Sequence, residues 1–195
     1  MDSVKLDKYT YDVLHSRFNS YKQSEIDISN IIRETGLPLR HQNPPEDITE
    51  NIVKFLIHNY DNDPSCKWAK SIGCKGDLYS DNYSIESPPE VKAFTSNGPL
   101  SFGPIKKFGI IYFLDMRNWL NDIFILWKVN VTNESNEWKQ IRMNKTQTFE
   151  DQCKEGRRPH ICWNYIYEQI PDKCMKIYEG TFDGIFTPRV MESNV

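Results

Sequence analysis

An aspartate, a glutamate and a lysine stand out in this chain by their types and spacing: Asp77, Glu90 and Lys92. Two carboxylates that converge from adjacent strands can hold a hard divalent cation such as Mg²⁺ through oxygen ligands. Lys92 follows Glu90 by two positions, so both lie on one face of a strand, because side chains alternate with period two. A metal at the carboxylates would activate water and stabilise charge at phosphorus, while the lysine polarises the nucleophile. The three residues therefore suit metal-assisted hydrolysis of a phosphodiester.

Local context separates this motif from a chance match. An acid-x-Lys tripeptide is weak evidence by itself, since a chain with 26% charged residues contains such matches at random. Glu137-Trp138-Lys139 is one of them, in a polar stretch without an upstream acid on a neighbouring strand. Asp77 instead precedes a turn at Ser80-Asp81-Asn82, and a short strand then leads into Glu90. A hairpin could therefore bring both acids to one end of a sheet; the alternative is a surface hairpin with an incidental charge pair.

The N-terminal third is predicted to be helical. Residues Tyr9 to Gln23 have the apolar spacing of a helix, and Ser24 could cap a second helix that Gly36 ends. Leu37 to Pro45 is a loop punctuated by prolines, and a third helix follows it. The residues of this third helix that face the core are Ile48, Ile52, Phe55 and Leu56.

Strands dominate the middle of the chain, and we expect them to form one mixed sheet. The expected strands are Asp77–Ser80, Tyr83–Glu86, Glu90–Thr95, Phe108–Leu114 and Ile123–Val131. Thr148 is predicted to cap a helix that extends to Glu155 and stops at Gly156. Ile161 to Gln169 is also predicted to be helical, and Tyr178 to Thr187 to form a late hairpin or edge pair.

Composition narrows the class of protein. Hydrophobic residues at 38% and aromatic residues at 13% exclude a wholly disordered chain. The net charge of −3 argues against a protein that coats nucleic acid indiscriminately. It is compatible with a sequence-specific binder, which can confine its basic residues to one cleft.

Cysteine usage and the N-terminus indicate an intracellular protein. The five cysteines make no Cys-x-x-Cys pair, and an odd number does not suit a closed disulfide framework, so reduced structural thiols are favoured over a zinc site. Met1 to Thr10 is charged and lacks the apolar run of a signal peptide. No segment approaches the roughly 18 apolar residues of a membrane span. We expect a cytoplasmic location and no membrane contact.

Several segments together resemble the PD-(D/E)XK nuclease superfamily, and within it the type II restriction endonucleases. The likeness runs from about Gly76 to Phe186. Its parts are Gly76-Asp77, Glu90-Val91-Lys92-Ala93, Ser101-Phe102-Gly103-Pro104, the apolar strand that ends in Asp115, and Gly156-Arg157-Arg158-Pro159. One departure is that Asp77 follows Gly76, where the first motif of the family is often Pro-Asp.

The resemblance implies a Mg²⁺-dependent type II restriction endonuclease that cuts both strands of duplex DNA within a short specific sequence and leaves 5′-phosphate ends. Asp77 and Glu90 would bind Mg²⁺, with the Val91 carbonyl as a further ligand, and Lys92 would orient and help to deprotonate the attacking water. Glu50 lies on the third predicted helix, from which many family members supply another glutamate. It would bind a second metal or hold Lys92; the alternative is a solvated first-turn acid, which the helix dipole favours.

The expected fold is α/β, a restriction-endonuclease-like core with a central mixed sheet flanked by helices. It forms a single nuclease domain over residues 1–195. Within it, residues 1–60 are a mainly helical part, residues 70–132 the catalytic sheet, and residues 133–195 a helical and hairpin part with loops that contact DNA.

Small polar and basic residues in the loops are candidates to contact DNA, since they can approach phosphates or pair with purine edges. Ordinary solvated loops are the alternative. The candidates are Thr95, Ser96, Asn97, Ser101, Lys106, Lys107, Lys139, Arg142, Asn144, Lys145, Gln147, Arg157 and Arg158. A homodimer is expected, because short palindromic sites are usually bound by proteins of matching two-fold symmetry.

Two other functions are compatible with the same residues. The first is a DNA repair or recombination nuclease of the same fold, such as a nicking enzyme or a junction resolvase. The second is a DNA-binding module without catalysis, because a sequence does not show whether the acids converge.

Overall fold

The computed structural model describes residues 8–187 of the chain. The α-helices are α1 (Lys8–Thr35), α2 (Glu46–Tyr60), α3 (Asn136–Lys139), α4 (Phe149–Lys154), α5 (Trp163–Gln169) and α6 (Phe182–Ile185). The strands are β1 (Lys67–Trp68), β2 (Leu78–Tyr79), β3 (Pro89–Phe94), β4 (Leu100–Ser101), β5 (Ile110–Asp115), β6 (Phe124–Val129), β7 (His160–Ile161) and β8 (Cys174–Gly180). Short 3₁₀ helices occur at η1 (Ala69–Ile72), η2 (Trp119–Asn121) and η3 (Pro171–Lys173).

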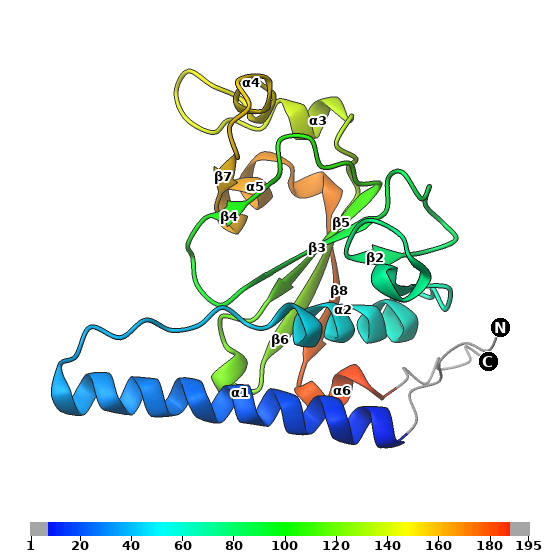
Figure 1. Ribbon diagram of the computed structural model, residues 1–195. Coiled ribbons are helices and arrows are strands. Elements are labelled where there is room, and N and C mark those ends of the chain that lie inside the picture. Colours follow the sequence, from blue (N-terminus) through cyan, green and yellow to red (C-terminus); the bar gives the residue numbers. More distant parts are fainter. Residues whose placement is uncertain (1–7, 188–195) are drawn as a thin grey trace.

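A four-stranded sheet in the order β3-β5-β6-β8 lies at the centre of the molecule (Figure 1). Strands β3 and β5 are parallel, whereas β5–β6 and β6–β8 are antiparallel. Two small antiparallel pairs, β1–β2 and β4–β7, lie beside it. The predicted α/β class with a central mixed sheet flanked by helices is confirmed, and it is consistent with a restriction-endonuclease-like fold. Strand β3, which carries Glu90 and Lys92, is an edge strand.

Strand β5 is buried on both faces and divides the core in two. Ile110, Tyr112 and Leu114 pack in a cluster with residues of α1, α2 and α6. Ile111 and Phe113 point the other way, into a cluster with residues of α3, α4 and α5. This explains why the strand is a continuous apolar run rather than an alternating one. The two helical groups therefore cover opposite faces of the sheet (Figure 1).

Residues Lys8–Thr35 form the single helix α1, so the prediction of two helices divided at Ser24 is wrong. No glycine or proline interrupts residues 8–35, and the helix continues through Ser24. Glu25 is only 3% exposed; it accepts a hydrogen bond from the backbone N–H of Gln42 at 3.0 Å and contacts His41. This glutamate thus anchors the loop that leads to α2. Gly36 ends the helix with φ +68°, as predicted.

The strand predictions between residues 77 and 86 need correction. Strand β2 is shorter than predicted and pairs with β1, outside the central sheet. Residues 84–87 form a turn instead of the predicted strand at 83–86: the Ser84 hydroxyl accepts from the Glu86 N–H, and the Ser84 carbonyl accepts from the Ser87 N–H. Local side-chain bonding of this kind competes with strand pairing. Asp77 and Glu90 are therefore not joined by a hairpin.

The fourth strand of the central sheet, β8, was predicted only in its last residues, as part of a hairpin or edge pair from Tyr178 to Thr187. It begins before the region expected to form a hairpin, and residues 182–185 are helical instead. Most of its side chains are exposed or half-buried, with Tyr178 as the buried member, so the period-two signal of a strand is weak.

Two predicted helices in the C-terminal part are confirmed: the one that Thr148 caps is α4, and the one that ends at Gln169 is α5. No helix in residues 8–187 is long and apolar enough to cross a membrane.

A partly buried ion pair fixes α2 against the sheet. Asp61, at the end of α2, pairs with Lys128 of β6 at 2.7 Å and accepts a hydrogen bond from the Tyr112 hydroxyl of β5 at 2.6 Å. Because both strands hold the same carboxylate, the helix that carries Glu50 has a fixed position over the sheet.

Candidate active site

Asp77 lies at the free edge of β3. Its Oδ2 accepts a hydrogen bond from the backbone N–H of Val91 at 2.9 Å, so the carboxylate satisfies a donor that no further strand within residues 8–187 pairs. The preceding residue, Gly76, has φ +111°, and a Cβ there would lie 2.5 Å from the Pro88 ring. Proline fixes φ near −65°, so it would not fit at position 76. The departure from a Pro-Asp motif thus has a local structural reason.

Glu90 and Lys92 project from one face of β3, as their spacing predicts. Glu90 is 2% exposed, and its Oε1 lies 2.6 Å from the Lys92 ammonium. That ammonium also lies over the Phe102 ring, 5.4 Å from the centroid. The strand and the ring together confine Lys92 beside the carboxylates.

Lys106 completes the cluster, although the sequence indicated it only as a DNA contact. Its ammonium lies 3.1 Å from Oδ1 of Asp77 and 2.5 Å from Oε2 of Glu90. Lys106 belongs to the connection between β4 and β5, far from either acid in sequence. No local spacing rule predicts this contact; the only signal was chemical, since two carboxylates placed close together favour more than one cation nearby.

Burial and neighbouring charges shift the pKa values of Glu90 and Lys106. Burial raises the pKa of Glu90, and the negative charge of Asp77 raises it further, against the opposing effect of the two lysines. Burial disfavours the charged form of Lys106, but Glu90 and Asp77 outweigh it, so the pKa of the lysine is raised. The cluster is therefore a desolvated arrangement in which each charge depends on its neighbours.

Glu50 is buried, so the interpretation of this residue as a solvated first-turn acid is wrong. It is 6% exposed, and one of its oxygens accepts a hydrogen bond from the indole N–H of Trp68 in β1. Burial raises the pKa of Glu50 to about 7; the Trp68 hydrogen bond lowers it, and the charge of Asp77 raises it. Asp77 thus interacts electrostatically with both Glu50 and Glu90. Trp68 was not foreseen as a member of the site.

The donor set of Asp77 and Glu90 fits a hard cation. Each carboxylate directs one oxygen at the same ammonium, so the two oxygens already accommodate a positive charge between them. Oxygen ligands of this type are those that Mg²⁺ prefers. In residues 8–187, no group of three or more His, Cys, Asp or Glu side chains is arranged to hold a metal. The remaining ligands would therefore come from backbone, water or substrate.

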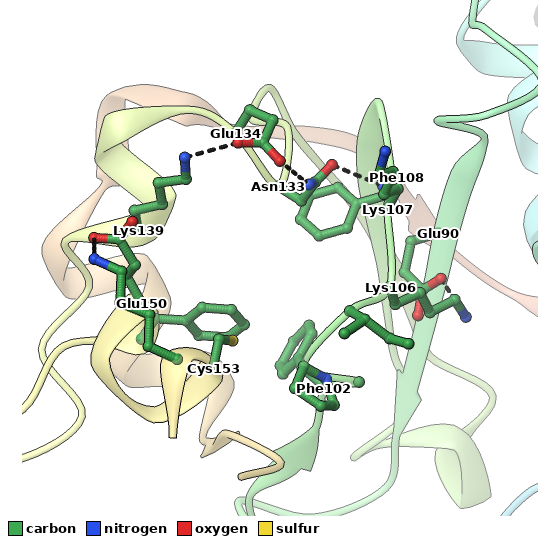
Figure 2. Close-up of a pocket in the computed structure, with 15 residues that line it drawn as sticks. Glu90, Phe102, Lys106, Lys107, Phe108, Asn133, Glu134, Lys139, Glu150 and Cys153 are labelled. Carbon is green, nitrogen blue, oxygen red and sulfur yellow. Dashed lines mark hydrogen bonds and ion pairs between the residues drawn. The ribbon is translucent and has the colours of Figure 1, made fainter. Parts of the chain in front are cut away.

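A cavity of about 390 Å³ opens next to Glu90 (Figure 2). Phe102, Phe108 and Phe149 line its apolar part, and Lys106 and Lys107 lie on the side of Glu90. Across the cavity, Lys139 pairs with Glu134 at 2.7 Å. The carboxylate cluster is thus accessible from a basic and aromatic hollow between β3 and the helical layer of α3 and α4.

The other candidate DNA contacts fall in three places. Thr95, Ser96, Asn97 and Ser101 lie on the connection from β3 into β4. Arg142, Asn144 and Lys145 line a second cavity of about 650 Å³, which α5 also borders. Arg157 and Arg158 lie between α4 and β7.

Several of these side chains already have partners within the protein. Asn97 accepts a hydrogen bond from Arg117 at 2.6 Å, and the Asn144 side chain accepts from the backbone N–H of Thr146 at 2.9 Å. Arg157 lies 3.0 Å from Glu155. These contacts organise the loops, and a DNA contact by the same atoms would have to replace or share them.

Comparison with known proteins gives the family of the chain. A family model, Bsp6I restriction endonuclease, matches residues 6–170. The type II restriction enzyme Bsp6I of Bacillus sp. (strain RFL6) is 39% identical over 61 residues, which are 31% of this chain and 33% of that enzyme. The aligned part thus spans about a third of that relative. No solved structure gives a significant match. Because the family model covers most of the chain, the protein belongs to the Bsp6I restriction endonuclease family.

Proposed function

We propose that the protein is a Mg²⁺-dependent type II restriction endonuclease of the PD-(D/E)XK superfamily, which cuts duplex DNA within a short specific sequence. One observation carries the proposal: Asp77 and Glu90 direct one oxygen each at a common cation, while Lys92 contacts the other oxygen of Glu90. Membership of the restriction endonuclease family supports the reaction class.

Asp77 and Glu90 would hold the metal, with the Val91 carbonyl as a further ligand. Bound there, Mg²⁺ would supply Lewis acidity to activate water and offset charge on the phosphate. The hydrogen bond from the Val91 N–H to Asp77 holds this carboxylate at the strand edge, so the ligand does not have to be ordered when DNA arrives.

Lys92 would orient the attacking water and favour the loss of its proton. Its position between Glu90 and the Phe102 ring leaves few alternative rotamers, so the ammonium is already placed. The water oxygen would form a bond to phosphorus as the bond from phosphorus to the 3′ oxygen breaks; the proton lost by the water would pass to bulk solvent, and the 3′ oxygen would take one up from solvent. The products would then be 5′-phosphate and 3′-hydroxyl ends.

Glu50 is the third acid of this proposal, after Asp77 and Glu90. The Lys92 ion pair in the structure is with Glu90, and Glu50 instead bonds Trp68. We therefore favour, of its two predicted roles, that of an acid close to Asp77 that can contribute to a second metal position. Because the pKa of Glu50 is raised to about 7, the side chain is partly protonated near neutral pH when no cation is bound.

The substrate and the oligomeric state that we propose are those expected of a type II restriction endonuclease. Double-stranded DNA would lie along the basic loops that flank the cavity, and a homodimer would place one site on each strand of a two-fold symmetric sequence. We place the enzyme in the cytoplasm, where its DNA substrate would be found.

Digestion of a mapped plasmid tests the proposal. With Mg²⁺ we expect discrete linear fragments with 5′-phosphate ends, and no cleavage with EDTA. Nicked circles alone would instead indicate a repair or recombination nuclease. A gel shift without cleavage in any divalent cation would indicate a DNA-binding module.

A further inference from the structure

The Lys106 ammonium lies where a metal bound by Asp77 and Glu90 would have to lie. It contacts Oδ1 of Asp77 at 3.1 Å and Oε2 of Glu90 at 2.5 Å. A divalent cation held by the same two oxygens would be in repulsive contact with this ammonium. The metal and Lys106 are therefore mutually exclusive at these oxygens, an inference that rests on the proposed function.

We propose that Lys106 is the internal counter-ion of the metal-free site, and that a divalent cation displaces it to the phosphate backbone of DNA. The two carboxylates then face a cation in both states, the Lys106 ammonium in one and the metal in the other. Lys106 becomes a positioning residue that contacts DNA only when the metal is bound.

Lys106 and Lys92 differ in how firmly each is held. Lys92 projects from a strand, lies over the Phe102 ring, and contacts the oxygen of Glu90 that does not face Asp77. Lys106 follows Ile105, which is 90% exposed, in a connection outside the central sheet. The metal can therefore replace Lys106 without breaking the Lys92 contact.

The surroundings indicate where the released ammonium goes. Lys106 lines the cavity beside Glu90, and the other acids there are Glu134 and Glu150. Glu134 pairs with Lys139 at 2.7 Å, and Glu150 pairs with Lys154 at 3.1 Å. Since both acids of this cavity already have lysine partners, an anion from outside the chain is the partner we expect for Lys106 within it. A DNA phosphate next to the scissile bond has the required charge.

The first test is calorimetric titration of Mn²⁺, without DNA, into the parent protein and Lys106→Met. Methionine keeps most of the apolar stem and removes the competing charge. We expect Lys106→Met to bind Mn²⁺ about tenfold more tightly. The matched control is Lys107→Met, which removes a lysine of the same cavity, and we expect its affinity to stay within about twofold of the parent. Lys106→Gln serves as a second variant if the methionine variant does not fold.

The second test separates displacement from a simple change in net charge. The salt dependence of DNA affinity is measured for the parent, Lys106→Met and Lys107→Met, in Ca²⁺ and in EDTA. A lysine that contacts a phosphate contributes about one unit to the logarithmic salt slope. For Lys106→Met, we expect the slope to fall by about one unit in Ca²⁺ and to stay unchanged in EDTA, where the ammonium is held by the carboxylates. Lys107→Met should show the same change, or none, in both conditions.

The outcomes distinguish this inference from the proposed function. If the parent binds Mn²⁺ and Lys106→Met binds it no more tightly, the metal site stands and the displacement of Lys106 is wrong. A salt slope that changes equally in Ca²⁺ and EDTA overturns the movement to DNA. If neither the parent nor any variant binds Mn²⁺ by itself or with DNA, the metal-dependent function fails, and this inference fails with it.

Discussion

Asp77 uses its two carboxylate oxygens for different purposes: Oδ2 accepts the backbone N–H of Val91 at 2.9 Å, whereas Oδ1 faces the Lys106 ammonium at 3.1 Å. The first contact fixes the aspartate to the edge of the strand that carries Glu90. The second leaves an oxygen directed at the position of a cation. The backbone hydrogen bond and the charge of this residue can therefore be separated by substitution.

Asp77→Asn removes the negative charge but keeps an oxygen that can accept from Val91. We expect the cleavage rate to fall by about a hundredfold or more, because the metal loses a charged ligand and the transition state loses the stabilisation that the metal supplies. DNA affinity should change only a few-fold. Glu90→Gln should behave in the same way. The measurements are single-turnover cleavage of a duplex in Mg²⁺ and its dissociation constant by gel shift.

Glu137→Gln is the matched control for these variants. Glu137-Trp138-Lys139 repeats the acid-x-Lys spacing, but Glu137 pairs with Lys173 at 3.1 Å, away from the carboxylate cluster. Its cleavage rate should equal that of the parent. Normal turnover by Asp77→Asn in Mg²⁺ would contradict the assignment of the metal site.

The sequence predicted the residues of the cluster better than the path that joins them. Glu90 and Lys92 meet because period two is a local property of a strand. The expected hairpin between Asp77 and Glu90 does not form, since residues 84–87 form a turn in place of the second strand. The acids nevertheless converge, because an unpaired N–H at a sheet edge needs an acceptor and Asp77 provides it.

Contacts that depend on tertiary packing could not be predicted in this way. Lys106 approaches the carboxylates from a loop, and Trp68 reaches Glu50 from a two-residue strand. The Ser24 prediction was wrong for a related reason. A polar residue with capping propensity stays inside a helix when the flanking residues continue the helix and pack on it.

Glu50→Gln should make the protein more stable above neutral pH. The pKa of Glu50 is about 7 in the folded protein, against an ordinary value of 4.5. An acid whose pKa is higher in the folded than in the unfolded protein contributes stability that is fully present below its unfolded pKa. This contribution is lost as pH rises through its folded pKa. The variant cannot lose it, and glutamine can still accept from Trp68. In EDTA, we expect equal stabilities near pH 4, and an advantage for the variant of up to about 3 kcal/mol at pH 8.

Urea unfolding at pH 4 and pH 8 measures this difference. Glu46→Gln, in the same helix but exposed, should gain no stability at pH 8. A Glu50→Gln variant that is equally or less stable than the parent at pH 8 would show that Glu50 is charged and well solvated.

Calcium should support DNA binding without cleavage. Ca²⁺ accepts the same oxygen ligands as Mg²⁺ but with longer and less regular coordination, so it activates water less well. We expect a stable gel shift in Ca²⁺ and cleavage of the bound DNA when Mg²⁺ is added in excess. Undiminished cleavage in EDTA would rule out a metal-dependent reaction.

Arg157 and Arg158 are held close to the site through Pro159. The Pro159 carbonyl accepts a hydrogen bond from the backbone N–H of Phe102 at 2.9 Å, and the Lys92 ammonium lies over the Phe102 ring. Because proline also restricts Arg158 to extended backbone, these side chains lose less entropy when they dock. We expect at least one of them to contact DNA, and the larger effect at Arg158, since Arg157 already pairs with Glu155.

Affinities for cognate and single-mismatch duplexes across a salt series distinguish the possible roles of these arginines. If Arg158 contacts a base, Arg158→Ala should cost about 1–3 kcal/mol and relax discrimination at one position of the site. If it contacts a phosphate, all duplexes should weaken alike and the salt slope should fall by about one unit. Glu155→Gln provides the control, because it frees Arg157 without removing an arginine. If Arg157→Ala and Arg158→Ala both bind every duplex like the parent and only their melting temperatures fall, the arginines stabilise the fold and do not contact DNA.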